Sequence, residues 1–115
     1  LIRFSVQAGA LLASSSENFC QQLLEFGKTL GLLFQIADDL LDVSATTAQL
    51  GKTAGKDQIT QKLTYPAVYG VEAAKAALKA HYQKAEYMLQ KLNDKEGVQT
   101  DTLLNLLQFT CNRPF

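Results

Sequence analysis

Apolar residues recur at helical spacing in the N-terminal part of the chain and predict two helices. Residues 1–13 are apolar on nearly every side, and Ser14 followed by Glu17 has the form of a capping box that opens a new helix. The second predicted helix runs from residue 15 to about residue 43 and leaves little polar surface except at its far end. Together the two segments predict a helical hairpin.

The helical periodicity then stops. Residues 44–57 are rich in small and polar side chains and contain two glycines, so we expect a loop there. Helical spacing begins again near residues 58–62 and restarts at residues 64–66, where a proline is tolerated in the first turn. This helix is expected to continue past Gly70 to about residue 92.

The C-terminal part predicts a turn and one more helix. Residues 93–97 have turn composition, and Thr100 or Asp101 caps a final short helix that reaches about residue 112. No segment alternates with the two-residue period of a β-strand, so the predicted fold class is all-α.

The second predicted helix is too long for a compact chain of this size. Residues 15–43 would measure roughly 40 Å, whereas a compact domain of 100 residues has a radius of gyration of about 13 Å. Gly27 and Gly31 lie four positions apart and permit another backbone to approach one face of this helix. The chain also starts without Met inside an apolar helical segment, so we expect a fragment of a larger domain.

Composition and charge exclude several classes of protein. The 115 residues are 47% hydrophobic and carry 11 basic and 11 acidic side chains, so no overall field favours nucleic acid or an anionic membrane. Cys20 and Cys111 lack the spacing of a zinc site and are expected to be buried thiols. The most apolar window, residues 19–37, contains Glu25 and Lys28 and fails as a membrane span.

Three aspartates interrupt the apolar pattern near the end of the long predicted helix. Asp38, Asp39 and Asp42 stand among Leu, Ile and Phe, where unpaired carboxylates are strongly disfavoured. Asp38 and Asp42 share a helix face, Asp39 lies one position round, and Gln35 lies one turn earlier. Such a one-sided array of oxygens suits a hard cation such as Mg²⁺, held through carboxylates and substrate phosphates.

Lysines follow the three aspartates in the predicted loop. Lys52 and Lys56 stand beside Gly51 and Gly55, and Lys62 comes a little later. Because carboxylates repel phosphate unless a metal bridges them, aspartates and lysines together favour a diphosphate ligand. Taken singly, each lysine is equally compatible with a solvated surface position.

These residues resemble the trans-isoprenyl diphosphate synthases, the family of the farnesyl and geranylgeranyl diphosphate synthases. GLLFQIADDLLD (31–42) is similar to that family's second aspartate-rich motif. GKTAGKD (51–57) and KLTYP (62–66) are similar to the segment after it, most closely in the geranylgeranyl-type branch. The resemblance covers essentially the whole chain. It implies that residues 1–115 are the C-terminal helices of an isoprenoid-synthase-type bundle, a fragment of a single polyprenyl synthase domain.

The resemblance also implies an activity and a metal. It implies an Mg²⁺-dependent prenyltransferase that condenses isopentenyl diphosphate head to tail with an allylic diphosphate, by way of an allylic cation. Asp38 would be the principal metal ligand. Asp39 and Asp42 would ligate directly or orient metal-bound water. Gln35 would support these ligands and belong to the substrate-binding residues.

Further residues match the family's substrate site. Lys52 would contact the allylic diphosphate, Lys62 would supply a second cation near it, and Phe34 would line the cavity where positive charge develops. Lys56 and Asp57 belong to the motif without individual roles. The catalytic set implied by the resemblance is Asp38, Asp39, Asp42 and Lys52.

Partners and alternatives follow from the same resemblance. The intact protein is expected to form a homodimer in the cytoplasm or a plastid, with no nucleic acid and no membrane span. The family's first aspartate-rich motif precedes the position matching Leu1, so the chain alone is expected to lack synthase activity. One alternative is a non-catalytic partner subunit, which would be expected to lose acidic ligands. Another is a terpene cyclase of the same fold, which lacks this lysine loop.

The remaining notable side chains are expected to be structural. His81 is expected at the surface of an amphipathic helix. Tyr65, Tyr69 and Phe109 are expected in the core.

Overall fold

The computed structural model describes residues 1–13, 15–50 and 63–112, and for residues 47–50 the backbone alone. Its elements, in chain order, are α1 (Ile2–Leu12), α2 (Glu17–Leu50), α3 (Tyr65–Tyr69), α4 (Val71–Glu96) and α5 (Asp101–Cys111). Within these ranges no residue forms a β-strand, so the predicted all-α class is confirmed.

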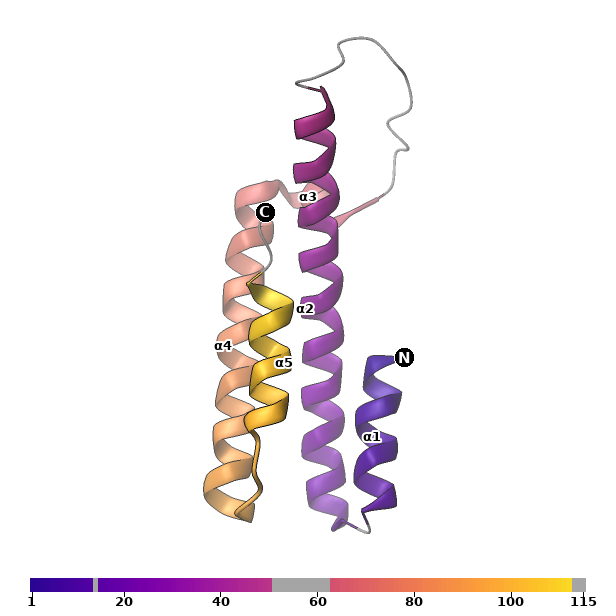
Figure 1. Cartoon of the computed structure of the whole chain (residues 1–115), viewed down its shortest axis with the longest axis vertical. Coiled ribbons are helices and arrows are strands. Elements are labelled where there is room, and N and C mark those ends of the chain that lie inside the picture. Colours follow the sequence, from indigo (N-terminus) through magenta and orange to yellow (C-terminus); the bar gives the residue numbers. More distant parts are fainter. Residues whose placement is uncertain (14, 51–62, 113–115) are drawn as a thin grey trace.

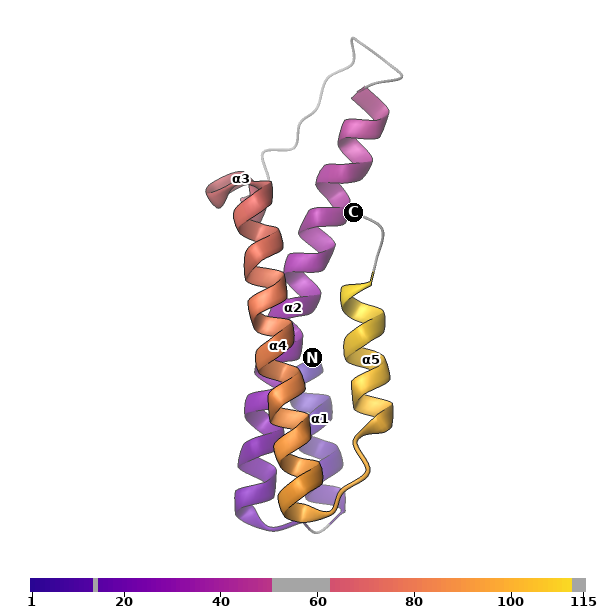
Figure 2. The same cartoon turned by 90° about the vertical axis from the view of Figure 1, so that its left-hand side faces the viewer.

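The helix α2 is the central element of the molecule (Figure 1). The helix α1 lies antiparallel beside its N-terminal half, and α4 and α5 pack along its other side (Figure 2). The predicted helical hairpin is therefore present as α1 and α2.

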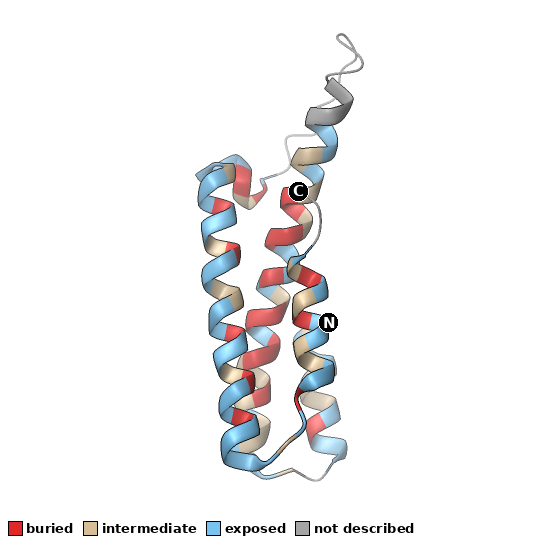
Figure 3. Cartoon of the chain, turned by 60° about the vertical axis from the view of Figure 1, so that its left-hand side comes forward, coloured by how far each residue is buried: buried red, intermediate tan, exposed pale blue. Residues whose placement is uncertain are grey.

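The hydrophobic core lies where α2 meets α4 and α5, and buried positions form a stripe along α2 (Figure 3). The largest fully buried side chains are Phe26, Leu30, Leu33, Ile36 and Leu40 on α2, Leu89 and Leu92 on α4, and Leu107 on α5. On α2 these residues recur every three or four positions, so they share one face of the helix. Burial of each such side chain contributes about 1.5–3 kcal/mol. This face fixes how α2 is rotated, and therefore which of its polar residues point away from the core.

Gly27 lets α1 approach α2 closely. A Cβ atom built on Gly27 would lie 3.1 Å from the Cα atom of Arg3 and 3.3 Å from the Cβ atom of Val6, both on α1. The same construction on Gly31 meets no atom within 4 Å. The close approach expected at the two glycines is thus confirmed at Gly27 only.

The helix α2 continues to Leu50, so the loop predicted for residues 44–57 is wrong in its first half. The hydroxyls of Ser44 and Thr46 donate to carbonyl oxygens four residues earlier, at 3.0 and 2.8 Å. These bonds satisfy the polar side chains within the helix, so polar composition alone does not end it. Residues 51–57 lie outside the described part of the chain.

Gly70 divides the helix that was predicted between residues 64 and 92. Its backbone has φ 89° and ψ 156°, a conformation that side-chain-bearing residues rarely adopt. Its N–H donates to the carbonyl of Pro66 at 2.8 Å, and its carbonyl accepts from the N–H of Ala74 at 3.0 Å. One residue therefore ends α3 and begins α4, and the chain changes direction there (Figure 2).

Two other helix ends differ from the predictions. The helix α4 includes most of the predicted 93–97 turn and is capped by Gly97. This glycine has a left-handed backbone, and its N–H donates to the carbonyl of Asn93 at 3.0 Å. At the start of α2 the backbone N–H of Phe19 donates to the hydroxyl of Ser16 at 3.2 Å, whereas Ser14 lies outside the described residues. The start of α5 after Thr100 is as predicted, but Thr100 makes no side-chain capping bond.

Several individual burial predictions need correction. Tyr69 and Phe109 are 65% and 71% exposed, so their assignment to the core is wrong. Cys20 and Cys111 are free thiols that are half-buried rather than buried, and His81 is half-buried rather than fully at the surface.

The molecule is elongated, with extents of 57 × 22 × 21 Å and a radius of gyration of 17.2 Å. A compact domain of similar length would have a radius of gyration of about 13 Å. This shape leaves large apolar side chains such as Phe4, Leu12 and Phe109 exposed. Among the described helices, none is long and apolar enough to cross a membrane.

Candidate functional site

The helix α2 presents two of the predicted metal ligands on one side. Asp42 is exposed and Asp38, one turn earlier, is half-buried. Phe34 precedes Asp38 by four residues and is 39% exposed. Because residues four apart lie above one another on a helix, these three side chains form one column, which we call the acidic column.

Asp39 has a different environment, with only 5% of its surface exposed. Its Oδ1 atom accepts a hydrogen bond from Nε2 of Gln35 at 2.9 Å. Its Oδ2 atom accepts one from the backbone N–H of Tyr65 at 3.1 Å. Both carboxylate oxygens therefore have protein donors, and the second donor comes from a different helix. The sequence reasoning placed Gln35 near Asp39 but missed Tyr65.

This carboxylate accepts from the first residue of α3. The first N–H groups of a helix have no acceptor within the helix and need other partners. Pro66 has no N–H, the N–H of Ala67 donates to Oγ1 of Thr64 at 3.3 Å, and the N–H of Tyr65 donates to Asp39. The first-turn donors of α3 are thus fully accounted for, one of them by a side chain of α2.

The predicted cations lie outside the described residues. These are Lys52 and Lys62, together with the motif residues Lys56 and Asp57. The structure therefore gives the arrangement of the aspartates, Gln35 and Phe34, and the lysine assignments stay predictions.

The donor set on α2 can be compared with what Mg²⁺ requires. Within residues 1–13, 15–50 and 63–112, no three His, Cys, Asp or Glu side chains are placed to hold one metal ion. Mg²⁺ is commonly bound by only one or two carboxylates, with waters and substrate phosphates as its other ligands. Asp38 and Asp42, one turn apart on the same side of α2, supply hard oxygen donors of this kind. Asp38 and Asp42 therefore fit an Mg²⁺ ion whose other ligands are waters and substrate phosphates.

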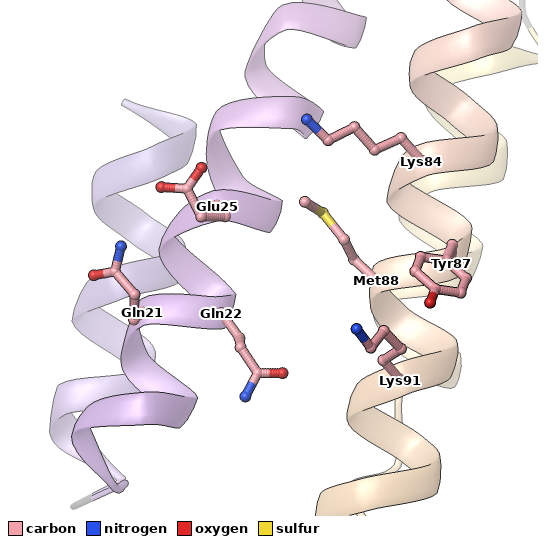
Figure 4. A pocket seen from close by; sticks show the side chains of 7 residues that line it. All are labelled: Gln21, Gln22, Glu25, Lys84, Tyr87, Met88 and Lys91. Carbon is pink, nitrogen blue, oxygen red and sulfur yellow. The ribbon is translucent and has the colours of Figure 1, made fainter.

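A groove lies between α2 and α4 (Figure 4). It holds about 490 Å³ and is lined by Gln21, Gln22, Glu25, Lys84, Tyr87, Met88 and Lys91. Glu25 precedes Asp38 by thirteen residues, a separation of about 20 Å along the helix axis. The groove is therefore not part of the site that contains the aspartates.

Comparison with known proteins relates the whole chain to one family. Residues 1–100 match the family model described as "Polyprenyl synthetase". Geranylgeranyl pyrophosphate synthase 4 of Arabidopsis thaliana is 38% identical over 113 residues, which cover 98% of this chain and 30% of that protein.

Two further relatives from Arabidopsis thaliana are similar to nearly the whole chain. Heterodimeric geranylgeranyl pyrophosphate synthase large subunit 1, chloroplastic, is 40% identical over 112 residues, covering 97% of this chain and 30% of the relative. Geranylgeranyl pyrophosphate synthase 6, mitochondrial, is 36% identical over 113 residues, covering 98% and 33%.

The chain spans a third or less of the length of each of these relatives. Their names place them in two organelles, so the family is not tied to one compartment. The names of these relatives agree with the geranylgeranyl-type resemblance of the chain. With a family model that matches residues 1–100, the chain belongs to the polyprenyl synthetase family.

Proposed function

We propose that this chain supplies one wall of the diphosphate site of a trans-prenyltransferase. The observation that carries the proposal is the acidic column, in which Asp38, Asp42 and Phe34 lie on one side of α2 away from the core. Membership of the polyprenyl synthetase family supports it. The proposed substrates are isopentenyl diphosphate and an allylic diphosphate.

Asp38 and Asp42 are the proposed Mg²⁺ ligands, with Asp38 as the principal one. Mg²⁺ bound there would supply positive charge to the diphosphate as negative charge develops on it. Asp39, which is buried and has two protein donors, is not assigned as a ligand. Lys52 and Lys62 would neutralise the remaining diphosphate oxygens.

The proposed reaction breaks the allylic C–O bond, and both electrons of that bond leave with the diphosphate. The double bond of isopentenyl diphosphate then forms a C–C bond to the resulting allylic cation, and loss of one proton restores a double bond. The ring face of Phe34, one turn before Asp38, provides negative potential for the positive charge. A site closed to water would protect the cation from hydrolysis.

The proposed assembly is a homodimer. One relative is named as the large subunit of a heterodimeric synthase, and this favours a different polyprenyl synthetase chain as a second candidate partner. Mass measurement of the purified protein, alone and after mixing with such a chain, distinguishes the two assemblies.

The test replaces the matching region of Arabidopsis thaliana geranylgeranyl pyrophosphate synthase 4 with this chain. In that chimera, Asp38→Ala should lower turnover by about a hundredfold or more, because charge stabilisation by a metal is worth several kcal/mol. Asp94→Ala on α4 is the matched control, since Asp94 is exposed and lies far along the chain from the acidic column. Unchanged turnover and unchanged Mg²⁺ dependence in the Asp38→Ala chimera would refute the ligand assignment.

A further inference from the structure

We infer that Asp39 is a positioning residue that fixes the start of α3 against α2, and is not a ligand of Mg²⁺. This role rests on the proposed function only because it leaves Asp39 out of the proposed Mg²⁺ ligands. It names a distinct role for a residue whose spacing alone groups it with Asp38 and Asp42.

Burial is the first argument. A hydrated Mg²⁺ ion keeps several waters and needs room around the carboxylate that binds it. Asp39 is only 5% exposed, whereas Asp42 is exposed and Asp38 half-buried. The position on the helix explains the contrast, since a step of one residue turns the side chain by about 100°.

The hydrogen bonds are the second argument. A buried carboxylate is tolerated when donors satisfy its oxygens, and here each oxygen has one at 2.9 or 3.1 Å. The Gln35 donor comes from one turn earlier on α2 and holds the carboxylate in place. The Tyr65 donor belongs to the first residue of α3, so this carboxylate links two helices through residues that are 26 positions apart in sequence.

The chain contains a matched local pair without this link. Nε2 of Gln90 donates to Oδ1 of Asp94 at 2.9 Å, the same Gln-to-Asp contact at the same four-residue spacing, but exposed on α4. The pair differs from Gln35 and Asp39 in burial, because Asp94 is exposed and its contact with Gln90 lies within α4. Asp94→Ala therefore measures the effect of losing the local Gln-to-Asp contact by itself.

The substitution Asp39→Asn distinguishes an anchor from a ligand. Asparagine keeps one oxygen that can accept from the N–H of Tyr65. Its NH₂ group can donate to the side-chain oxygen of Gln35 once the Gln35 amide rotates by about 180° to present that oxygen. It has no negative charge to offer a cation. An anchor therefore survives this change, and a metal ligand does not.

The first measurement is hydrogen exchange at the Tyr65 amide in the chain without metal. We expect protection in the parent, in Asp39→Asn and in Asp94→Ala, and exchange faster by about tenfold or more in Asp39→Ala. Continued protection of Tyr65 in Asp39→Ala would overturn the anchoring role. If Asp39→Ala does not fold, Gln35→Ala replaces it: the carboxylate then loses the donor that holds it in place, Tyr65 should exchange faster, and unchanged protection of Tyr65 would overturn the anchoring role.

The second measurement uses the chimera with geranylgeranyl pyrophosphate synthase 4. Asp38→Asn should raise the half-saturating Mg²⁺ concentration by about tenfold or more, and Asp39→Asn should leave it unchanged. Asp39→Ala should raise KM for the allylic diphosphate, because α3 begins against Asp39, the residue next to Asp38 on α2, and Asp39→Asn should restore it. If Asp39→Asn raised the Mg²⁺ requirement as Asp38→Asn does, Asp39 would be a ligand and the inference would be wrong.

The two proposals fail separately. If Asp38→Asn leaves the Mg²⁺ requirement unchanged, the proposed metal site is wrong, while exchange at Tyr65 still decides the role of Asp39. If Tyr65 exchange is insensitive to Asp39→Ala, the anchor is wrong and the metal proposal stands.

Discussion

A single carboxylate on α2, that of Asp39, accepts from the first N–H of α3, and its removal has a predictable cost. Asp39→Ala leaves the N–H of Tyr65 without its acceptor, which should lower the free energy of unfolding by about 1–3 kcal/mol. Asp94→Ala removes the equivalent contact from an exposed pair and should cost less than about 0.5 kcal/mol. Urea unfolding of both variants and the parent measures the difference. Equal costs would show that only the local contact counts.

Two groups near the contact of α4 with α5 should lower the free energy of unfolding as the pH becomes alkaline. Burial raises the pKa of the Cys111 thiol. Burial, and then the nearby Glu86 carboxylate, raise the pKa of the Tyr82 hydroxyl. Because both pKa values are higher in the folded chain, the unfolded chain loses these protons at lower pH than the folded chain does. The resulting stabilisation is complete below the unfolded pKa values and is lost as pH rises through the folded ones.

We therefore expect the urea midpoint to fall above about pH 8.5 and to fall further above about pH 10, near the ordinary pKa values of Cys and Tyr. The double variant Tyr82→Phe/Cys111→Ala should show a shallower fall than the parent over the same range. Parallel pH profiles for the two proteins would contradict the prediction, because other groups would then carry the whole effect.

Side chains within one helix could be related from the sequence, and those on different helices could not. The four-residue spacing of Phe34, Asp38 and Asp42 already implies one face of a helix, and the structure keeps them in one column. The partner of Asp39 is a backbone N–H 26 residues away, and no periodicity relates the two. Spacing therefore grouped three aspartates whose exposure differs in the fold: Asp42 is exposed, Asp38 is half-buried and Asp39 is buried.

At the scale of helices, the contact of α1 with α2 should depend on one glycine and not on its neighbour. Ala is favoured over Gly inside a helix by about 0.5–1 kcal/mol, and Gly31→Ala should gain about this much because nothing lies within 4 Å of the new methyl group. Gly27→Ala places a methyl group 3.1 Å from the Cα atom of Arg3. The backbone of α1 must then shift, which should cost about 1 kcal/mol or more. Thermal unfolding of the two variants checks the opposite signs, and stabilisation by both would contradict the close approach.

Helix ends were harder to predict than helices because a few atoms decide them. Polar composition predicted a loop from residue 44, but hydroxyls that bond within the helix let α2 continue to Leu50. Periodicity predicted one helix across Gly70, but the positive φ of that residue divides it into α3 and α4. Both errors concern local backbone geometry, which a pattern of apolar positions does not contain.

At the scale of the whole molecule, the elongated shape and the position of the acidic column bear on activity. Among the described helices Asp42 is exposed and Asp38 is half-buried. The carbocation chemistry proposed for this site needs water to be excluded from it. The chain also spans a third or less of each relative. We therefore expect no synthase turnover from the 115-residue chain by itself.

The chimera supplies the matched comparison for that expectation. When the chain replaces the matching region of Arabidopsis thaliana geranylgeranyl pyrophosphate synthase 4, the rest of that protein provides the other walls of the site, and turnover should appear. Incorporation of labelled isopentenyl diphosphate, measured with Mg²⁺ and an allylic diphosphate, compares the chain, the chimera and the unmodified relative. Turnover by the chain alone would show that these helices already enclose a complete site. An inactive chimera that unfolds at the same temperature as the relative would instead show that the acidic column of this chain cannot serve the reaction proposed for it.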